Sequence, residues 1–162
     1  GDGYDVWLAL LSSDSFRKVV MLKILPGDQC DSRPVRRERA IAEKFSGGKF
    51  LDFAAAWRKD SVAYIAVEFF GYSLEDAVDL KHFEDISLTT RMKLVMDLLD
   101  GLGEMEQEGF CHANISPKVL FVKTGARPSL KIGGLERAFK WRGARLPWNR
   151  RWRLSEAERG VV

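Results

Sequence analysis

The chain has 162 residues, of which 46% are hydrophobic and 30% charged, and its formal net charge is +3. These values are typical of one soluble globular domain or a piece of a larger one, and no apolar run approaches the ~18 residues that a membrane-spanning helix needs. Two isolated cysteines, Cys30 and Cys111, and only two histidines make a zinc site improbable.

The first third of the chain predicts an antiparallel hairpin and then a helix. Residues 6–11 and 18–25 are apolar, β-rich runs on either side of a Ser/Asp turn. Residues 32–45 have a Ser and a Pro at their start and Gly47-Gly48 after their end, which is typical of a helix.

Glu38 is predicted to lie on the inward face of that helix. It stands three residues after Val35, three before Ile41 and four before Ala42. A carboxylate at such a position is costly unless it is paired, whereas Glu43 should face water.

The middle of the chain predicts two more strands and a hinge. Residues 50–57 and 62–70 are strand candidates on either side of the polar turn 58–61. Gly71 interrupts the pattern, and Ser73 is an acceptable N-cap for a short helix.

Residues 88–108 give the strongest helical signal, which ends at Gly109. Apolar residues recur at spacings of three and four, so much of this helix is expected to be buried; the stripe consists of Leu88, Met92, Val95, Leu98 or Leu99, Leu102 and Met105, widened by Leu94 and Met96. Residues 119–122 and 130–132 then predict a small hairpin.

Two loops in this region carry the most informative pattern. The stretch Phe-Cys-His-Ala-Asn-Ile-Ser-Pro-Lys-Val at 110–119 and Leu-Lys-Ile-Gly-Gly-Leu-Glu at 130–136 resemble the catalytic and metal loops of protein kinases. The resemblance implies an α+β, kinase-like fold. We expect a five-stranded antiparallel N-lobe sheet with one helix over residues 1–70, a truncated and mainly helical C-lobe over 71–139, and a tail over 140–162.

The reactive groups of those loops are absent from the matching positions. Asn114 stands where the family has its catalytic Asp, and Ser116 stands where it has a Lys. Val119 and Gly134 occupy the positions of the two magnesium ligands, an Asn and an Asp. The resemblance therefore implies a pseudokinase without phosphoryl transfer and without a metal site.

Other positions match the nucleotide pocket of the family. Lys23, in Val-Met-Leu-Lys, resembles the Lys that reaches the phosphates and pairs with a helix Glu, here Glu38. That pair is either a retained nucleotide contact or a structural salt bridge. The hinge of Glu68, Phe69, Phe70 and Gly71 would offer backbone groups to an adenine ring, with Val67 at the back of that pocket. ATP without magnesium is the one candidate cofactor, bound weakly if the pocket has not collapsed.

The tail is basic and rich in tryptophan. From Arg137 onward there are eight basic residues against two acidic ones. Either the tryptophans pack on their own domain, or the tail binds a partner or an anionic surface; its candidate contact residues are Trp141, Arg142, Arg145, Trp148, Arg150, Arg151, Trp152 and Arg153.

The leading functional hypothesis is a scaffold or allosteric regulator of a protein partner, which the resemblance suggests is an active kinase. The alternatives are an atypical phosphotransferase that uses a displaced acid such as Glu136, and an anionic-surface binder that uses the tail. No nucleic acid is expected as a partner. Since the family's lower lobe is longer, the chain is expected to be a fragment, or to have the helix at 88–108 covered by a second chain or by the tail; cover by the tail or a partner is the preferred alternative.

A narrower likeness, to the secreted rhoptry pseudokinases of apicomplexan parasites, is based on Gly134-Leu135-Glu136 and the basic segment after it. That likeness implies a secreted or secretory-organelle protein, and without it the cytoplasm is the default. The first residues, Gly1 to Tyr4, do not resemble a signal peptide and leave the compartment open.

Overall fold

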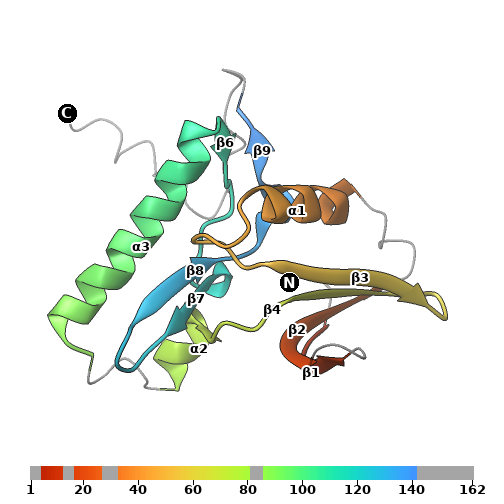
Figure 1. Ribbon diagram of the computed structural model, residues 1–162, viewed down its shortest axis with the longest axis horizontal. Helices are drawn as coiled ribbons and strands as arrows, with labels where there is room; N and C mark the ends of the chain where they lie inside the picture. The colour runs from red at the N-terminus through yellow and green to blue at the C-terminus, as the bar shows by residue number, and fades with distance from the viewer. Residues whose placement is uncertain (1–4, 13–16, 27–32, 81–85, 142–162) are drawn as a thin grey trace, which may run out of the picture.

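The computed structural model describes residues 5–12, 17–26, 33–80 and 86–141. Over those residues the fold is mixed α+β, with antiparallel sheets and few helices. The larger sheet lies on one side of the molecule and a long helix, α3, lies on the other, with a small sheet between them (Figure 1). None of the helices in the described ranges is long and apolar enough to cross a membrane.

The larger sheet contains four strands in the order β1-β2-β4-β3. They are β1 (Asp5–Ser12), β2 (Arg17–Pro26), β3 (Phe53–Lys59) and β4 (Val62–Glu68). The predicted hairpin of the first two strands is confirmed, and so is the second pair. Asp60 and Ser61, which join β3 to β4, both have positive φ, as a tight two-residue hairpin turn requires. The expected fifth strand is not confirmed, since the described part of this sheet has four.

Helix α1 (Arg33–Lys44) packs its apolar face against this sheet and against the second part of the molecule. Val35 joins Leu25 and Ile65 in one buried cluster, while Ile41 and Phe45 join another that continues into the small sheet. Glu38 is 7% exposed and Glu43 is exposed, as their spacing along the helix predicts.

The second part of the molecule mixes two α-helices with two small sheets, so it is less helical than expected. Its elements are β5 (Tyr72–Ser73), α2 (Leu74–Asp79), α3 (Leu88–Gln107), β6 (Phe110–Cys111), the 3-10 turn η2 (Pro117–Val119), β7 (Leu120–Lys123), β8 (Ser129–Ile132), the 3-10 turn η3 (Leu135–Arg137) and β9 (Phe139–Lys140).

The predicted small hairpin is present as β7 and β8, and the sequence pattern missed the short strand β5 that pairs with β7. Gly71 enters β5 so close to β7 that a Cβ on it would lie 2.2 Å from the carbonyl oxygen of Val122. Ser73 caps α2 by accepting a hydrogen bond from the Asp76 N–H, as its position predicts. A second missed pairing joins β6 to β9.

Helix α3 forms where it is predicted, and its predicted stripe is buried only in part. The buried residues are Leu94, Asp97, Gly101 and Met105, which pack toward β8 and the segment after α1. Two members of the stripe, Leu94 and Met105, are thus buried, and Leu98 and Leu102 are partly buried against the core. The expectation was wrong for Leu88, Met92, Val95, Met96 and Leu99, which are exposed, because two apolar stripes share this helix and periodicity alone does not say which one meets the core.

The two parts of the molecule are joined by a continuous core and by backbone hydrogen bonds. Phe50 and Ile132 are fully buried and form a parallel bridge between the segment after α1 and strand β8. The Leu51 N–H donates to the Ile132 carbonyl at 3.0 Å, and the Ile132 N–H donates to the Lys49 carbonyl at 2.8 Å. This seam holds the larger sheet and the small sheet on opposite sides of one cleft.

Candidate functional site: a cleft between the two sheets

A cavity of about 520 Å³ opens between the larger sheet and the small sheet. β1, β2, α1 and β4 contribute one wall, and α2, η2, β7 and the residues after β8 contribute the other. Most of the lining side chains are apolar, and the charged ones come from a few positions in α1, α2, β2 and η2. We call the first wall the upper wall and the second the lower wall.

The upper wall holds a buried ion pair. Lys23 on β2 lies opposite Val6 of β1 and Ile65 of β4, in the middle of the larger sheet. Its Nζ donates to Glu38 Oε1 of α1 at 2.5 Å, and the two side chains are only 14% and 9% exposed. The structure thus brings together the two residues predicted as a pair, and each lowers the cost of burying the other.

The predicted hinge residues have two different roles in the structure. Val67 is buried at the end of β4 and lines the cavity, together with Phe69 and Gly71 of the predicted hinge. Glu68 and Phe70 do not line it. Glu68 Oε2 instead accepts from Lys131 Nζ of β8 at 2.6 Å, and that ammonium lies 5.4 Å from the centroid of the Phe70 ring.

This Glu68–Lys131 ion pair is a contact that sequence reasoning missed. Its side chains are 17% and 15% exposed, and the same carboxylate accepts from the Asp52 N–H at 3.2 Å. The pair joins the end of β4 to β8, which lie 63 residues apart in the chain. No local spacing could have indicated it, because it depends on the way the two sheets are placed.

A buried, neutral histidine lies next to the lower wall without lining the cavity. His112 is 3% exposed; its Nε2 donates to the Gly133 carbonyl at 2.9 Å and its Nδ1 accepts from the Asn114 N–H at 3.3 Å. Burial lowers the pKa of His112 below its usual value of 6.5, against the opposing effect of the bond to Gly133. His112 therefore acts as a connector between the two loops.

Asn114 and Ser116 follow on the same loop. The Asn114 side-chain amide donates to Glu136 Oε1 of η3 at 3.4 Å, so this loop contacts the one after β8 a second time. Ser116 precedes η2 and makes no side-chain capping bond there. Lys118 forms an ion pair with Glu75 of α2 at 3.5 Å, at the mouth of the cavity.

Val119 and Gly134 pack directly on one another. Gly134 has a φ of 69°, and a Cβ built on it would lie 2.4 Å from Val119 Cγ1 and 2.9 Å from Val119 Cβ. The Gly133 N–H also donates to the Val119 carbonyl at 2.8 Å. The space that a side chain at position 134 would need is therefore occupied by the isopropyl group of Val119.

The side chains at positions 119 and 134 offer nothing to a divalent cation. Magnesium takes oxygen ligands, and neither a valine side chain nor a glycine hydrogen supplies one. Within residues 5–12, 17–26, 33–80 and 86–141, no group of three or more His, Cys, Asp or Glu side chains is placed to hold a metal ion.

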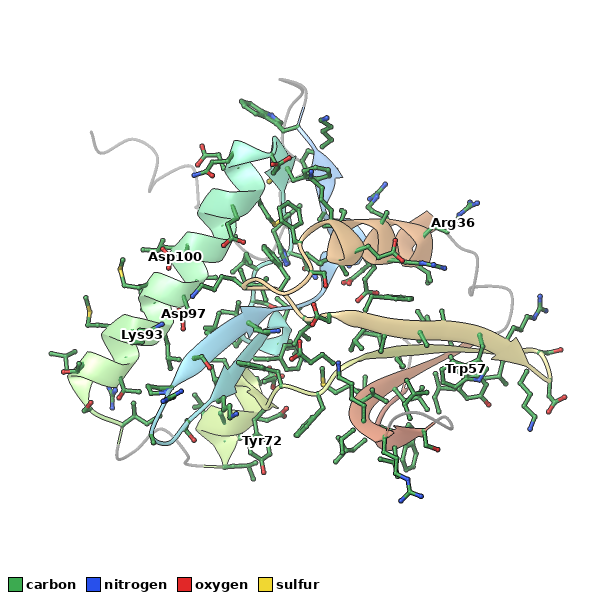
Figure 2. The ribbon with its side chains drawn as sticks, in the orientation of Figure 1. Arg36, Trp57, Tyr72, Lys93, Asp97 and Asp100 are labelled. Carbon is green, nitrogen blue, oxygen red and sulfur yellow. The ribbon has the colours of Figure 1, made fainter. Side chains whose placement is uncertain are left out.

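A second charged cluster lies outside the cleft, on the inner face of α3. Asp97 is 1% exposed and accepts from Lys49 Nζ and Lys93 Nζ, each at 2.5 Å, and from the Leu130 N–H at 3.1 Å (Figure 2). Burial alone would raise the pKa of Asp97, but these hydrogen bonds hold it below its usual value. Sequence reasoning missed this residue, although a lone Asp between apolar residues was a visible signal.

The candidate contact residues of the tail fall mostly outside the described residues, as Arg142, Arg145, Trp148, Arg150, Arg151, Trp152 and Arg153 do. Trp141 is described: it is 54% exposed, and its backbone N–H donates to the Gly109 carbonyl at 2.7 Å.

A scan against protein-family models and a search of curated proteins gave no match to this chain. The chemistry of the cleft therefore has to be inferred from its own side chains.

Proposed function

We propose that this chain is a kinase-like protein that does not transfer phosphate and that acts by binding a protein partner, as a scaffold or allosteric regulator. Three features support the kinase-like part of the proposal. One is the order of a hairpin, a helix and a second hairpin; another is the Lys23–Glu38 pair under that helix; the third is the apolar cleft between the two parts.

The observation that carries the loss of catalysis is the packing of Val119 on Gly134. A phosphoryl-transfer site needs magnesium to neutralise charge on the transferring group, and the matching positions here offer no oxygen. A side chain at position 134 would collide with Val119, so a single substitution would not restore a ligand there. Asn114, at the position of the catalytic base, is uncharged and is turned to Glu136.

The upper wall supports a residual affinity for nucleotide. Lys23, Glu38 and Val67 line the same cavity, so a purine base and one phosphate would find an apolar slot and an ammonium. Without metal ligands, binding should be weak and indifferent to magnesium. Several large apolar side chains on β1, among them Trp7 and Leu10, are exposed and suit a protein partner.

Thermal unfolding of the full chain with ATP, with and without magnesium, tests this proposal. We expect a small rise in Tm that is the same in both conditions and disappears in Lys23→Met. Lys18→Met, on an exposed position of the same strand, is the matched control and should respond as the unchanged protein does. A rise of several degrees that requires magnesium would contradict the proposal.

One observation favours an atypical phosphotransferase as the second candidate. Glu136 Oε1 lies 3.4 Å from the Asn114 side-chain nitrogen, so a carboxylate is present near the position of the missing base. Incubation with γ-labelled ATP and a mixed protein acceptor separates the two candidates. Labelled product that is formed by the unchanged chain and lost in Glu136→Gln would establish the enzyme and refute the first proposal.

A further inference from the structure

The outer face of α3 carries an apolar stripe that nothing in the described residues covers. Leu88, Met92, Val95, Met96 and Leu99 recur at three- and four-residue spacings, and each is about half exposed or more. Gly103 continues the stripe, and a Cβ on it would meet no atom within 4 Å. We call these six residues the outer stripe of α3; a patch of this kind usually marks a contact surface.

The chain leaves the described structure beside this helix. β9 pairs with β6, which follows directly on α3, and the Trp141 N–H donates to the carbonyl of Gly109 at the C-terminal end of the helix. Figure 1 shows β6 and β9 side by side at that end. Residues 142–162 therefore start within reach of the outer stripe.

The length of that segment is sufficient. Helix α3 has 20 residues and so is about 30 Å long. The 21 residues from 142 to 162 could extend to about 70 Å. In an extended conformation they can run back along the whole helix with residues to spare, and as a helix they would be about as long as α3 itself.

The charge and the apolar residues of the segment 142–162 are complementary to the outer face of α3. Asp100 and Glu106 are exposed on the C-terminal half of α3, whereas Asp97 is buried on the inner face and paired with two lysines. Residues 142–162 carry six arginines against two glutamates, together with Trp148 and Trp152. Tryptophan and arginine are enriched among the residues that contribute most to binding at interfaces.

We propose that residues 142–162 lie along the outer stripe of α3, with Trp148 and Trp152 on the apolar residues and arginines beside Asp100 and Glu106. The contact is made within one chain. It completes the second part of the molecule. Because the tryptophans of the tail pack on their own chain, a partner would contact the arginines of the tail instead. The inference stands independently of the loss of phosphoryl transfer.

Photo-crosslinking in the full chain tests the contact directly. Benzoylphenylalanine at position 99, in the middle of the stripe, should on illumination form an intramolecular bond that peptide mapping places within 142–162. The same probe at exposed Lys59, in the β3–β4 hairpin away from α3 (Figure 1), is the matched control and should form none. A bond between two copies would assign the stripe to a dimer instead, and the absence of any bond to the tail would refute the proposal.

Methionine oxidation gives a second readout from native residues. Met92 and Met96 belong to the stripe, whereas Met105 is 1% exposed and serves as an internal reference. Trp148→Ser with Trp152→Ser should raise the peroxide oxidation rates of Met92 and Met96 about threefold or more and leave Met105 unchanged. The proposal would be overturned if Met92 and Met96 were oxidised at the same rates in the double variant as in the unchanged chain.

Discussion

The two walls of the cleft are stabilised in different ways. The upper wall keeps a charged pair, Lys23 and Glu38, in a place where burial makes unpaired charge costly. The lower wall has no such charge at Val119 and Gly134, and it fills the space between them with a methyl group. Both arrangements are locally complete: one by electrostatic pairing and the other by packing.

The two walls therefore respond differently to substitution. On the lower wall, a side chain added at position 134 has no open space to enter. Because Val119 fills that space, the two positions depend on each other. The upper wall depends on two residues as well, but there the loss of one leaves a buried charge.

The largest effect is expected from breaking the upper wall. Glu38→Ala should lower the free energy of unfolding by about 3 kcal/mol, because the Lys23 ammonium loses its carboxylate partner in a buried place. Urea denaturation measures the change. Glu43→Ala, on the solvent face of α1, removes only an exposed i,i+4 pair with Arg39 and should cost about 0.4 kcal/mol. Equal losses in the two variants would mean that the buried pair has no special weight.

A smaller loss is expected from crowding the lower wall. Gly134→Ala should cost about 2 kcal/mol, from a positive φ and from overlap with Val119. The cost should fall in a Val119→Ala background but not vanish, because alanine keeps the Cβ that would lie 2.9 Å away. Gly103→Ala, at a position of α3 where a Cβ meets no atom within 4 Å, is the control and should raise stability by about 0.5 to 1 kcal/mol.

If Gly134→Ala cost the same in both backgrounds, the contact with Val119 would not be what restricts position 134. Urea midpoints of the four proteins (the unchanged chain, each single variant and the double variant) give this coupling directly.

Helices α1 and α3 show how far the sequence could predict the fold. α1 has a single apolar face, so spacing alone placed Glu38 inside and Glu43 outside. α3 has two candidate faces, and the tertiary structure chose the one with Asp97, which the Lys49 and Lys93 side chains and the Leu130 N–H compensate. Periodicity predicted both helices. It could not show that the face of α3 with the paired carboxylate of Asp97 would be buried while the face with Met92 and Met96 would be exposed.

The site was predictable to a similar extent. Lys23, Glu38 and Val67 could be found because their strand and helix positions are set locally. The overlap of Val119 with Gly134 and the Glu68–Lys131 pair could not, because both join segments that only the assembled sheets bring together. The residue types at positions 119 and 134 predicted that neither would supply a metal ligand, but not that the space between them is filled.

The smallest effect is expected in the pH dependence of stability, through the neutral His112 next to the lower wall. His112 has a pKa below 6.5 in the folded chain because it is buried, whereas in the unfolded chain it should titrate near 6.5. Between those two values the unfolded state binds more protons, so the free energy of unfolding should fall as pH drops from 7.5 to 5.5. One histidine sets an upper limit of about 1.4 kcal/mol per pH unit.

Urea denaturation across that pH range should therefore give a shallower slope for His112→Gln, which keeps an N–H donor for the Gly133 carbonyl. His82→Gln is the matched control for the second histidine of the chain. The low pKa values of Asp52 and Asp97 affect stability only at lower pH, below their usual range near 3.8, so they do not contribute to this window. An unchanged slope in His112→Gln would mean that the ring titrates with the same pKa in the folded and the unfolded chain, and a steeper slope would mean that the folded chain holds the ring charged; either result would contradict the prediction.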